Sequence, residues 1–297
     1  MPKRTDIFTI IYTSGTTGTP NGVMLNYEWV NQVIQHERVQ PSYGIYQGVS
    51  ERVLSYLPLN HISERIVSEV SSIVAGSEVS FSESLEKFAS NLQSVQPTQF
   101  FAVPRIWVKI QHGILAKLPQ NKLNLLLKVP FVSTLIKNKI KAGIGLGKVR
   151  SAVSGAAPVS AELLDWYKKL DINIQEVYGA TELCGGVTYN ALDEISTGTV
   201  GKPLHGTDIK IDPKTDEGFD AAPWTMLGYY KSEDKTAEVM DGKYYRTGDT
   251  GRFDEKGNLI ITGRIKDTFK TAKGKFVLPV PLEHHFADNH FIEQVVV

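Results

Sequence analysis

The feature that most constrains the fold is an alternation of short β-rich runs with longer amphipathic segments over the first two-thirds of the chain. Strands of this length that alternate with helices are typical of a layered α/β sheet. The strand-like runs are 7–12, 52–57, 78–81, 99–103, 148–153 and 173–177. The segments with helical spacing are 27–39, 62–75, 85–95, 105–118 and 161–170.

The pattern changes after about residue 199 to short alternating runs separated by turn residues, such as Asp241-Gly242 and Lys256-Gly257-Asn258. Glycine and asparagine in these positions favour tight turns between antiparallel strands. We therefore predict an αβ subdomain over residues 1–198 and a small β-rich subdomain over 199–263. Residues 264–297 then open with a lysine- and glycine-rich stretch and continue with a helix-strand pattern.

Composition and charge exclude several classes of protein. Lys plus Arg and Asp plus Glu are balanced at 32 each, which gives no reason to expect a nucleic-acid partner. Cys184 is the single cysteine, so an intramolecular disulfide is impossible. The N-terminus lacks the pattern of a signal peptide, and the most apolar stretch, 123–136, is too short to span a bilayer. We expect a cytoplasmic location.

A dense set of hydroxyl groups and glycines follows the first strand. Glycine lets the backbone approach a phosphate closely, and Ser and Thr hydroxyls add uncharged donors. The segment fits neither a Walker loop nor a G-x-G-x-x-G fingerprint, and a polar surface loop is the alternative interpretation. The residues are Thr13, Ser14, Gly15, Thr16, Thr17 and Gly18.

This loop and five later segments, in the same order, resemble the signature motifs of the adenylate-forming superfamily of acyl-CoA synthetases, luciferases and peptide-synthetase adenylation domains. The resemblance runs from Ile11 to Val297 and implies the adenylate-forming fold, with ATP and Mg²⁺ as ligands. The later segments are 57–61 (LPLNH), 154–158 (SGAAP), 178–182 (YGATE), 245–249 (YRTGD) and 263–267 (GRIKD).

Residue types in these motifs suit the roles that the resemblance implies. Tyr178 offers a flat ring to a purine, and Thr181 a hydroxyl to the α-phosphate. Glu182 is a hard oxygen ligand for Mg²⁺, which takes few carboxylates when phosphates and water complete its shell. Asp249 can accept hydrogen bonds from ribose hydroxyls, and Arg264 can add a donor near the same sugar or phosphate. Taken singly, Tyr178 has a structural alternative as a core aromatic and Asp249 as a turn former.

The remaining site residues rest on the resemblance alone. It places the adenine against Gly155, Ala156, Ala157, Pro158 and Gly179. It makes residues 264–297 a hinge and the start of a C-terminal α+β lid. Lys266 is then the hinge about which the C-terminal domain turns between two half-reactions, although a solvated turn lysine is the alternative. His61 would line the acyl pocket, although a histidine at a helix start is also common as a cap.

Two segments indicate a long acyl chain. Residues 97–107 (PTQFFAVPRIW) and 273–277 (KGKFV) look like stretches of long-chain acyl-CoA synthetases. The resemblance therefore implies ATP-dependent activation of a long-chain fatty acid to an acyl adenylate, followed by a thioester with coenzyme A. Transfer to an acyl-carrier protein, as in an acyl-ACP synthetase, is an alternative.

One segment is markedly basic, with eleven Lys or Arg and no Asp or Glu between Lys87 and Ala161. Its partner is expected to be anionic, either the phosphates of coenzyme A or a membrane surface that delivers fatty acid. We favour peripheral contact with a membrane, because the lysines interleave with apolar runs at 123–127 and 131–136. The lysines are Lys117, Lys122, Lys128, Lys137, Lys139 and Lys141.

Three departures from the family pattern weaken the enzymatic interpretation. Asn21 stands where relatives carry a lysine beside the phosphates. Residues 217–222 look shortened, so we expect a packing role to be lost there. Family members are longer, and we expect this sequence to lack both an N-terminal subdomain and a C-terminal lysine needed for adenylation. A non-catalytic nucleotide- or acyl-binding remnant, or a split-gene fragment completed by a second chain, therefore stays open.

Overall fold

The computed structural model describes residues 3–13, 20–31, 50–267, 269–270 and 276–277. The chain divides into two compact units. Unit 1 comprises residues 1–40 and 176–297, and unit 2 comprises residues 41–175. The boundaries expected near residues 199 and 264 divide the chain differently and stay predictions.

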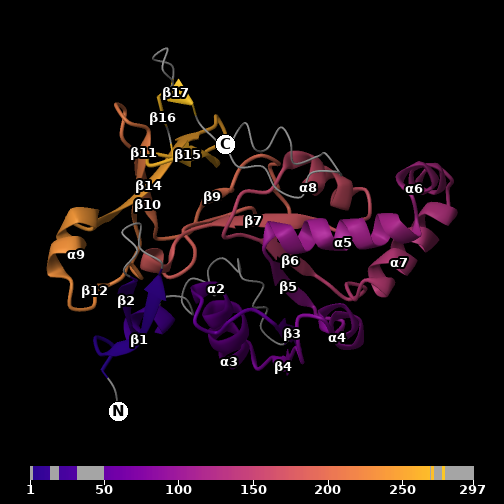
Figure 1. The fold of residues 1–297 in the computed structure, drawn as a ribbon, viewed down its shortest axis with the longest axis horizontal. Helices are drawn as coiled ribbons and strands as arrows, with labels where there is room; N and C mark the ends of the chain where they lie inside the picture. Colours follow the sequence, from indigo (N-terminus) through magenta and orange to yellow (C-terminus); the bar gives the residue numbers. More distant parts are fainter. Residues whose placement is uncertain (1–2, 14–19, 32–49, 268, 271–275, 278–297) are drawn as a thin grey trace. The chain divides into compact units, whose positions relative to one another are not determined.

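Unit 2 is built on four parallel strands in the order β4-β3-β5-β6 (Figure 1). Parallel neighbours need a crossover connection, and a helical segment follows each of the first three strands. This arrangement confirms the layered α/β expectation and the strand runs predicted in this part of the chain. The strands are β3 (Arg52–Ser55), β4 (Glu78–Phe81), β5 (Gln99–Ala102) and β6 (Ser151–Ser154).

The helices of unit 2 begin and end at recognisable signals. The Ser160 hydroxyl accepts a hydrogen bond from the backbone N–H of Leu163 at 3.2 Å and so caps the last helix. Pro104 occupies the first turn of α5, where its missing N–H costs nothing. The helices are α4 (Phe88–Val95), α5 (Pro104–Lys117), α6 (Gln120–Leu127), α7 (Val132–Gly143) and α8 (Ala161–Lys168).

The segment predicted as a helix over 62–75 is helical throughout but changes type. It runs through α2 (Ile62–Glu64), a π-helical turn η1 (Arg65–Val70) and α3 (Ser71–Ala75). Gly76 ends it in the left-handed region at φ 65°, a backbone conformation that glycine adopts without a side-chain penalty. Residues 27–31 of the helix predicted over 27–39 are helical, and the rest lies outside the described residues.

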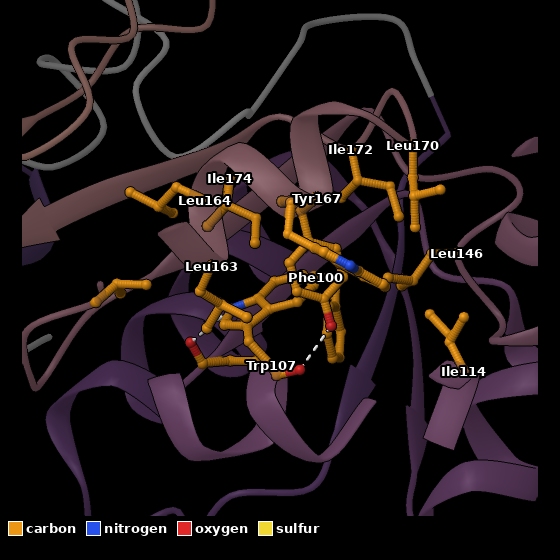
Figure 2. Close-up of a cluster of buried hydrophobic side chains, with 14 of the residues drawn as sticks. Phe100, Trp107, Ile114, Leu146, Leu163, Leu164, Tyr167, Leu170, Ile172 and Ile174 are labelled. Atoms are coloured by element: carbon orange, nitrogen blue, oxygen red, sulfur yellow. Dashed lines mark hydrogen bonds between the residues drawn. The ribbon is translucent and has the colours of Figure 1, made fainter. Parts of the chain in front are cut away.

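The core of unit 2 is aromatic at its centre (Figure 2). Trp107 contacts Phe100 and Tyr167 edge to face, with ring centroids 5.2 and 5.1 Å apart. The Tyr167 hydroxyl donates to the Trp107 carbonyl oxygen at 2.6 Å, and the Trp107 indole donates to the Ala102 carbonyl oxygen at 3.2 Å. Each ring therefore buries its apolar face while its polar atom keeps a partner.

The described residues of unit 1 contain four antiparallel groups of strands. In the first, β1, β2 and β12 form a sheet, and in the second, β7, β8 and β9 are consecutive antiparallel neighbours. β7 starts in unit 2 and its last three residues belong to unit 1. These strands are β1 (Ile7–Thr13), β2 (Asn21–Asn26), β7 (Ile174–Tyr178), β8 (Thr188–Tyr189), β9 (Lys202–Pro203) and β12 (Gly228–Tyr229).

The third group is a five-stranded sheet in which β10, β11, β14 and β13 lie in order and β15 pairs with β14. It confirms the β-rich texture expected after residue 199, and helix α9 (Glu233–Val239) precedes β13. A further pair, β16 (Phe269–Lys270) and β17 (Phe276–Val277), is antiparallel. The five strands are β10 (Asp208–Ile211), β11 (Glu217–Ala221), β13 (Met240–Asp241), β14 (Tyr244–Phe253) and β15 (Leu259–Arg264).

The expectation that residues 217–222 have lost a packing role is wrong. This segment forms β11, which pairs on one side with β10 and on the other with β14. Four of its five residues are buried, including Glu217 and Asp220. The altered residues therefore still build a central strand.

Among the described residues, no helix combines the length and apolar character that crossing a bilayer requires.

Candidate functional site

The clearest polar cluster of unit 1 gathers around Asp249. Tyr178, the last residue of β7, donates its hydroxyl to Asp249 Oδ2 at 2.9 Å. Arg264 Nε donates to Asp249 Oδ1 at 2.9 Å, because Asp249 on β14 lies opposite Arg264 on β15. Three residues singled out in separate motifs of the sequence therefore share one carboxylate.

The electrostatics of this cluster keep the Tyr178 phenol protonated. Burial raises the pKa of Tyr178 well above its ordinary value, and the nearby Asp249 and Asp220 carboxylates raise it further. A protonated phenol can act as a hydrogen-bond donor to Asp249, whereas a phenolate could not. The side chain of Arg264 remains 67% exposed, so the cluster has one side open to solvent.

Asp220 is a part of this region that the motifs did not predict. It is 1% exposed on β11, and its Oδ2 has no hydrogen-bond partner among the described residues. Burial, followed by the charge of Asp249, raises the pKa of Asp220 to about 7. Asp220 lies within the segment 217–222, which departs from the family pattern. Nothing in the sequence, however, shows that Asp220 faces Asp249.

Glu182 occupies a second polar position of unit 1, on the 3₁₀ turn η2 (Thr181–Leu183). Its Oε1 accepts a hydrogen bond from the Tyr229 hydroxyl at 2.8 Å. Burial, and then the Glu182 charge, raise the pKa of both Tyr229 and Tyr245. Tyr229 was missed in the sequence, where it reads as an ordinary strand residue.

The surroundings of Glu182 fit a Mg²⁺ ion that binds together with a nucleotide. No group of three or more His, Cys, Asp or Glu side chains that could enclose a metal ion occurs among the described residues. A metal held only by protein ligands is therefore not supported there. A single carboxylate fits Mg²⁺ that arrives with a nucleotide, because the phosphates and water then supply the other ligands.

The chain near Glu182 is held tightly by backbone contacts. The Met226 N–H donates to the Glu182 carbonyl oxygen at 2.8 Å, and the Cys184 N–H donates to the Thr181 carbonyl oxygen at 3.0 Å. A Cβ on Gly179 would lie 2.7 Å from the Gly185 carbonyl oxygen, so only glycine fits there. These contacts fix the turn that carries Thr181 and Glu182.

The predicted phosphate loop is described only at its ends. Thr13 ends β1 opposite Asn21, the first residue of β2. Ser14, Gly15, Thr16, Thr17 and Gly18 lie outside the described residues. Lys235 of α9 donates from Nζ to Asn21 Oδ1 at 2.7 Å, which places an ammonium group at the base of this loop. Sequence reasoning missed Lys235, which is remote from every motif.

The remaining candidates all belong to unit 2 except Lys266. Gly155 is buried after β6, whereas Ala156, Ala157 and Pro158 are exposed, and all four belong to unit 2. Ala156 has a positive φ of 67°, an uncommon conformation for alanine. His61, also in unit 2, caps α2 with its Nδ1 2.7 Å from the Ser63 hydroxyl. Lys266 lies in a turn after β15 in unit 1.

Comparison with known proteins identifies related sequences. The profile of the AMP-binding enzyme family matches residues 1–224. The chain is 32% identical over 322 residues to the long-chain-fatty-acid–CoA ligase FadD15 of Mycobacterium bovis, covering 99% of this chain and 52% of that protein. It is 31% identical to long chain acyl-CoA synthetase 3 of Arabidopsis thaliana, covering 99% of this chain and 50% of that protein. The chain thus spans about half the length of these relatives.

Solved structures share the fold at lower identity. The anthranilate CoA ligase AuaEII in complex with anthranoyl-AMP superposes with a TM-score of 0.75 at 22% identity, over 98% of this chain and 53% of that one. The o-succinylbenzoate CoA synthetase of Bacillus subtilis gives a TM-score of 0.76 at 21% identity, over 99% of this chain and 56% of that one. Both comparisons establish that the fold is that of part of an adenylate-forming domain.

Proposed function

This chain belongs to the AMP-binding enzyme family, and on that premise we propose that it carries the nucleotide site of a long-chain fatty acid–CoA ligase. The substrates would be a long-chain fatty acid, ATP and coenzyme A. The substrate class is supported by the two relatives above, whose names describe long-chain acyl-CoA ligases. The site itself is supported by residues of this chain.

The observation that carries the proposal is the shared carboxylate of Asp249. Tyr178 and Arg264 each donate to one of its oxygens, and each oxygen keeps a further lone pair for a ligand hydroxyl. Vicinal ribose hydroxyls match two acceptor oxygens on one carboxylate. The ring of Tyr178 next to them offers a flat surface for the purine, with Gly155, Ala156, Ala157, Pro158 and Gly179 as the proposed remainder of the adenine site.

The phosphates of ATP would bind at the glycine and hydroxyl loop formed by Thr13, Ser14, Gly15, Thr16, Thr17 and Gly18. Asn21 leaves this loop without a lysine of its own, and Lys235 supplies an ammonium group to the same position from α9. An ammonium beside phosphate oxygens forms charge-assisted hydrogen bonds. Thr181 would orient the α-phosphate. Mg²⁺ held by Glu182 would neutralise charge on the departing pyrophosphate when bound.

The reaction implied by these positions has two steps and needs no covalent bond to the protein. An oxygen of the fatty-acid carboxylate attacks the α-phosphorus, and the bond from that phosphorus to the bridging oxygen of pyrophosphate breaks. The sulfur of coenzyme A, having lost its proton, then attacks the acyl carbonyl carbon and AMP leaves with its electron pair. Fixed donors that face the developing charge stabilise both transition states.

Two further roles complete the proposal. His61 would line the acyl pocket, and Lys266 would act as the hinge between the two steps. Hydrogen bonding to Ser63 orients the His61 ring, and burial lowers the pKa of His61, which favours an uncharged imidazole suited to an apolar chain. Lys266 follows β15 directly, so the strand that positions Arg264 also sets where the hinge begins.

A second candidate function is nucleotide or acyl-adenylate binding without turnover. It is favoured by Asn21, which leaves the predicted phosphate loop without a lysine of its own. Under this reading the chain either acts as a binding protein or works with a second chain. An acyl-carrier protein in place of coenzyme A as the acceptor is a variant of the first proposal.

Two assays separate these functions. Pyrophosphate release is measured with Mg-ATP and a panel of acids from acetate to palmitate, and binding of a palmitoyl sulfamoyl adenosine is measured by calorimetry. Turnover that rises with acyl length supports the ligase. Tight binding of the analogue without turnover supports the second candidate. Absence of both would contradict the nucleotide site itself.

A further inference from the structure

Two helices of unit 2, α6 and α7, meet at a turn that faces solvent (Figure 1). Leu123 is the buried residue of α6, and α7 contains none. Large apolar side chains are instead exposed around the turn, an arrangement that marks an interaction surface when the side chains are contiguous. We call this set the α6–α7 tip: Leu125 (65% exposed), Val129 (42%), Phe131 (91%) and Leu135 (67%).

The tip residues are exposed even though α6 and α7 are held firmly against the rest of unit 2. Gln120 at the start of α6 accepts a hydrogen bond from the Trp166 indole at 2.8 Å, and Lys137 of α7 pairs with Asp171 at 2.9 Å. Ile136 and Ile140 pack against the core of unit 2. The inner faces of both helices are therefore used for packing, and the tip residues are those that point away.

The backbone at Phe131 has a conformation that is costly for a large side chain. Phe131 has φ 64° and ψ −47°, and the Val132 N–H donates to the Pro130 carbonyl oxygen at 2.7 Å. This is a γ-turn of the rare, positive-φ type, which is strained for residues other than glycine. A bulky, 91% exposed aromatic at such a position contributes little to the stability of the fold. We therefore expect the Phe131 side chain to contact another molecule.

Lysines surround the tip in a regular way. Lys122, Leu125 and Val129 follow one another at helical spacing along α6 and its last turn, and Leu135 and Lys139 do so along α7. Lys128 lies in the turn itself. Lys122, Lys128 and Lys139 are exposed, and none of the three forms an ion pair within the described part of the chain. Along the chain, Lys128 therefore lies between the apolar residues of the tip, and Lys122 and Lys139 lie beyond them on either side.

From this arrangement we propose that the α6–α7 tip docks on an anionic phospholipid surface. Phe131 and its apolar neighbours enter the interfacial region, and the three lysines contact the headgroup phosphates and carboxylates. The segment from Lys87 to Ala161 contains no acid, so nothing on it repels such a surface. This inference does not rest on the proposed function, because it uses none of the residues of the nucleotide site.

Other occupants fit the tip less well. A second copy of the chain would bring the same lysines against these and repel them. A nucleic acid would neutralise the lysines but leave four apolar side chains in water. An anionic bilayer accommodates both kinds of side chain, because its charged headgroups lie directly above its hydrocarbon.

The proposal is tested by co-sedimentation of the whole chain with phosphatidylcholine vesicles, prepared with and without phosphatidylserine. Binding is expected with the anionic vesicles, and it should weaken as salt is added because the lysine contribution is screened. Phe131→Asn should reduce the partition coefficient about tenfold, since it removes a buried ring. Asparagine tolerates positive φ, so this variant should fold at least as well as the original chain.

Matched variants isolate each contribution. Leu85→Asn removes another apolar side chain, 74% exposed, from outside the tip and should leave binding unchanged. Lys122→Gln, Lys128→Gln and Lys139→Gln together should reduce binding about a hundredfold, at about fivefold for each lysine. The same change at Lys168, Lys169 and Lys256, which are exposed elsewhere, should reduce it by less than about threefold.

Tryptophan fluorescence of a variant at position 131 reports whether the tip enters the bilayer. Phe131→Trp should show a blue shift and quenching by brominated acyl chains on anionic vesicles, beyond the signal of the original chain. Equal binding to neutral vesicles, insensitivity to Phe131→Asn, or equal effects of the two lysine sets would overturn the proposal. So would concentration-dependent dimers that Phe131→Asn abolishes, because the tip would then be a contact between copies.

Discussion

The core of unit 2 is fully buried and apolar, whereas the Asp249 cluster of unit 1 is partly buried and polar. Around Trp107 the polar atoms of the aromatic residues are hydrogen-bonded and the remaining surface is apolar. Around Asp249, two carboxylates and a phenol lie close together, and one carboxylate oxygen of Asp220 has no partner among the described residues. The first arrangement stabilises the fold. The second lowers stability, and such perturbed groups concentrate at functional sites.

The largest change in stability is expected when the centre of the unit 2 core is removed. Trp107→Ala deletes a fully buried side chain that contacts Phe100 and Tyr167. We expect a loss of about 3–5 kcal/mol in the free energy of unfolding, from lost burial and a residual cavity. Urea denaturation measures it, with Leu125→Ala on the exposed side of α6 as the control. A loss below about 1 kcal/mol would show that the site collapses or that unit 2 depends on other contacts.

The opposite effect is expected in unit 1, at Asp220. Its pKa of about 7 in the folded state lies above the ordinary value, so the folded state holds a proton that the unfolded state has released. Stability should therefore fall as pH rises from about 4 to 7, by about 1.4 kcal/mol per unit. Asp220→Asn should remove this slope and raise stability at pH 8 by about 2–4 kcal/mol. Denaturation across this pH range measures it.

Glu176 provides an internal check on that prediction. Burial raises its pKa to about 8, and its Oε2 has no hydrogen-bond partner among the described residues. Glu176→Gln should remove a second, separate slope that extends to higher pH than the first. If neither substitution changes the pH dependence, then the two acids are not buried in protonated form and the contrast between the regions fails.

A smaller effect should separate ligand binding from stability. Asp249→Asn keeps the shape of the side chain but removes the negative charge of the carboxylate, which accepts hydrogen bonds from Tyr178 and Arg264. We expect AMP to bind about 10–100-fold more weakly, the usual value of a charge-assisted hydrogen bond. Calorimetric titration measures the affinity, with Asp241→Asn at the exposed end of β13 as the control. Unchanged AMP affinity would remove Asp249 from the site.

The smallest effect is expected at Lys235. Lys235→Met removes the ammonium group that Asn21 holds at the base of the loop. ATP affinity should fall about tenfold, while adenosine affinity should stay the same, because only the phosphates carry charge. Lys235→Arg should retain most of the affinity, and Lys256→Met is the matched control. Equal losses for ATP and adenosine would mean that Lys235 has only a structural role.

Much of the fold was accessible from the sequence because periodicity and turn residues are local signals. The strand run at 99–103 and the helix at 105–118 differ from β5 and α5 by one residue at their ends. Motifs also identified Tyr178, Asp249 and Arg264, which the structure brings together. Lys128 and Pro130, which interrupt the apolar stretch 123–136, lie in the turn between α6 and α7, but the positive φ of Phe131 has no sequence signal.

What the sequence could not show are contacts between remote residues. Lys235 and Asn21 are separated by 214 positions, and Tyr229 and Glu182 by 47. Neither pair belongs to one motif, so only the tertiary arrangement of α9, β2, β12 and η2 brings them together. The burial of Asp220 is hidden for a related reason. An aspartate near turn residues is normally exposed, and its position here is set by the pairing of β11 between two strands.

The central claim is that one nucleotide is held by residues gathered from distant motifs around Asp249. A crystal structure of the chain with palmitoyl sulfamoyl adenosine tests it most directly. The account predicts the ribose hydroxyls on the Asp249 carboxylate, the purine against the Tyr178 ring and the sulfamoyl group near Thr181. Clear density for the ligand at any other place, with Asp249 still bonded only to Tyr178 and Arg264, would contradict it.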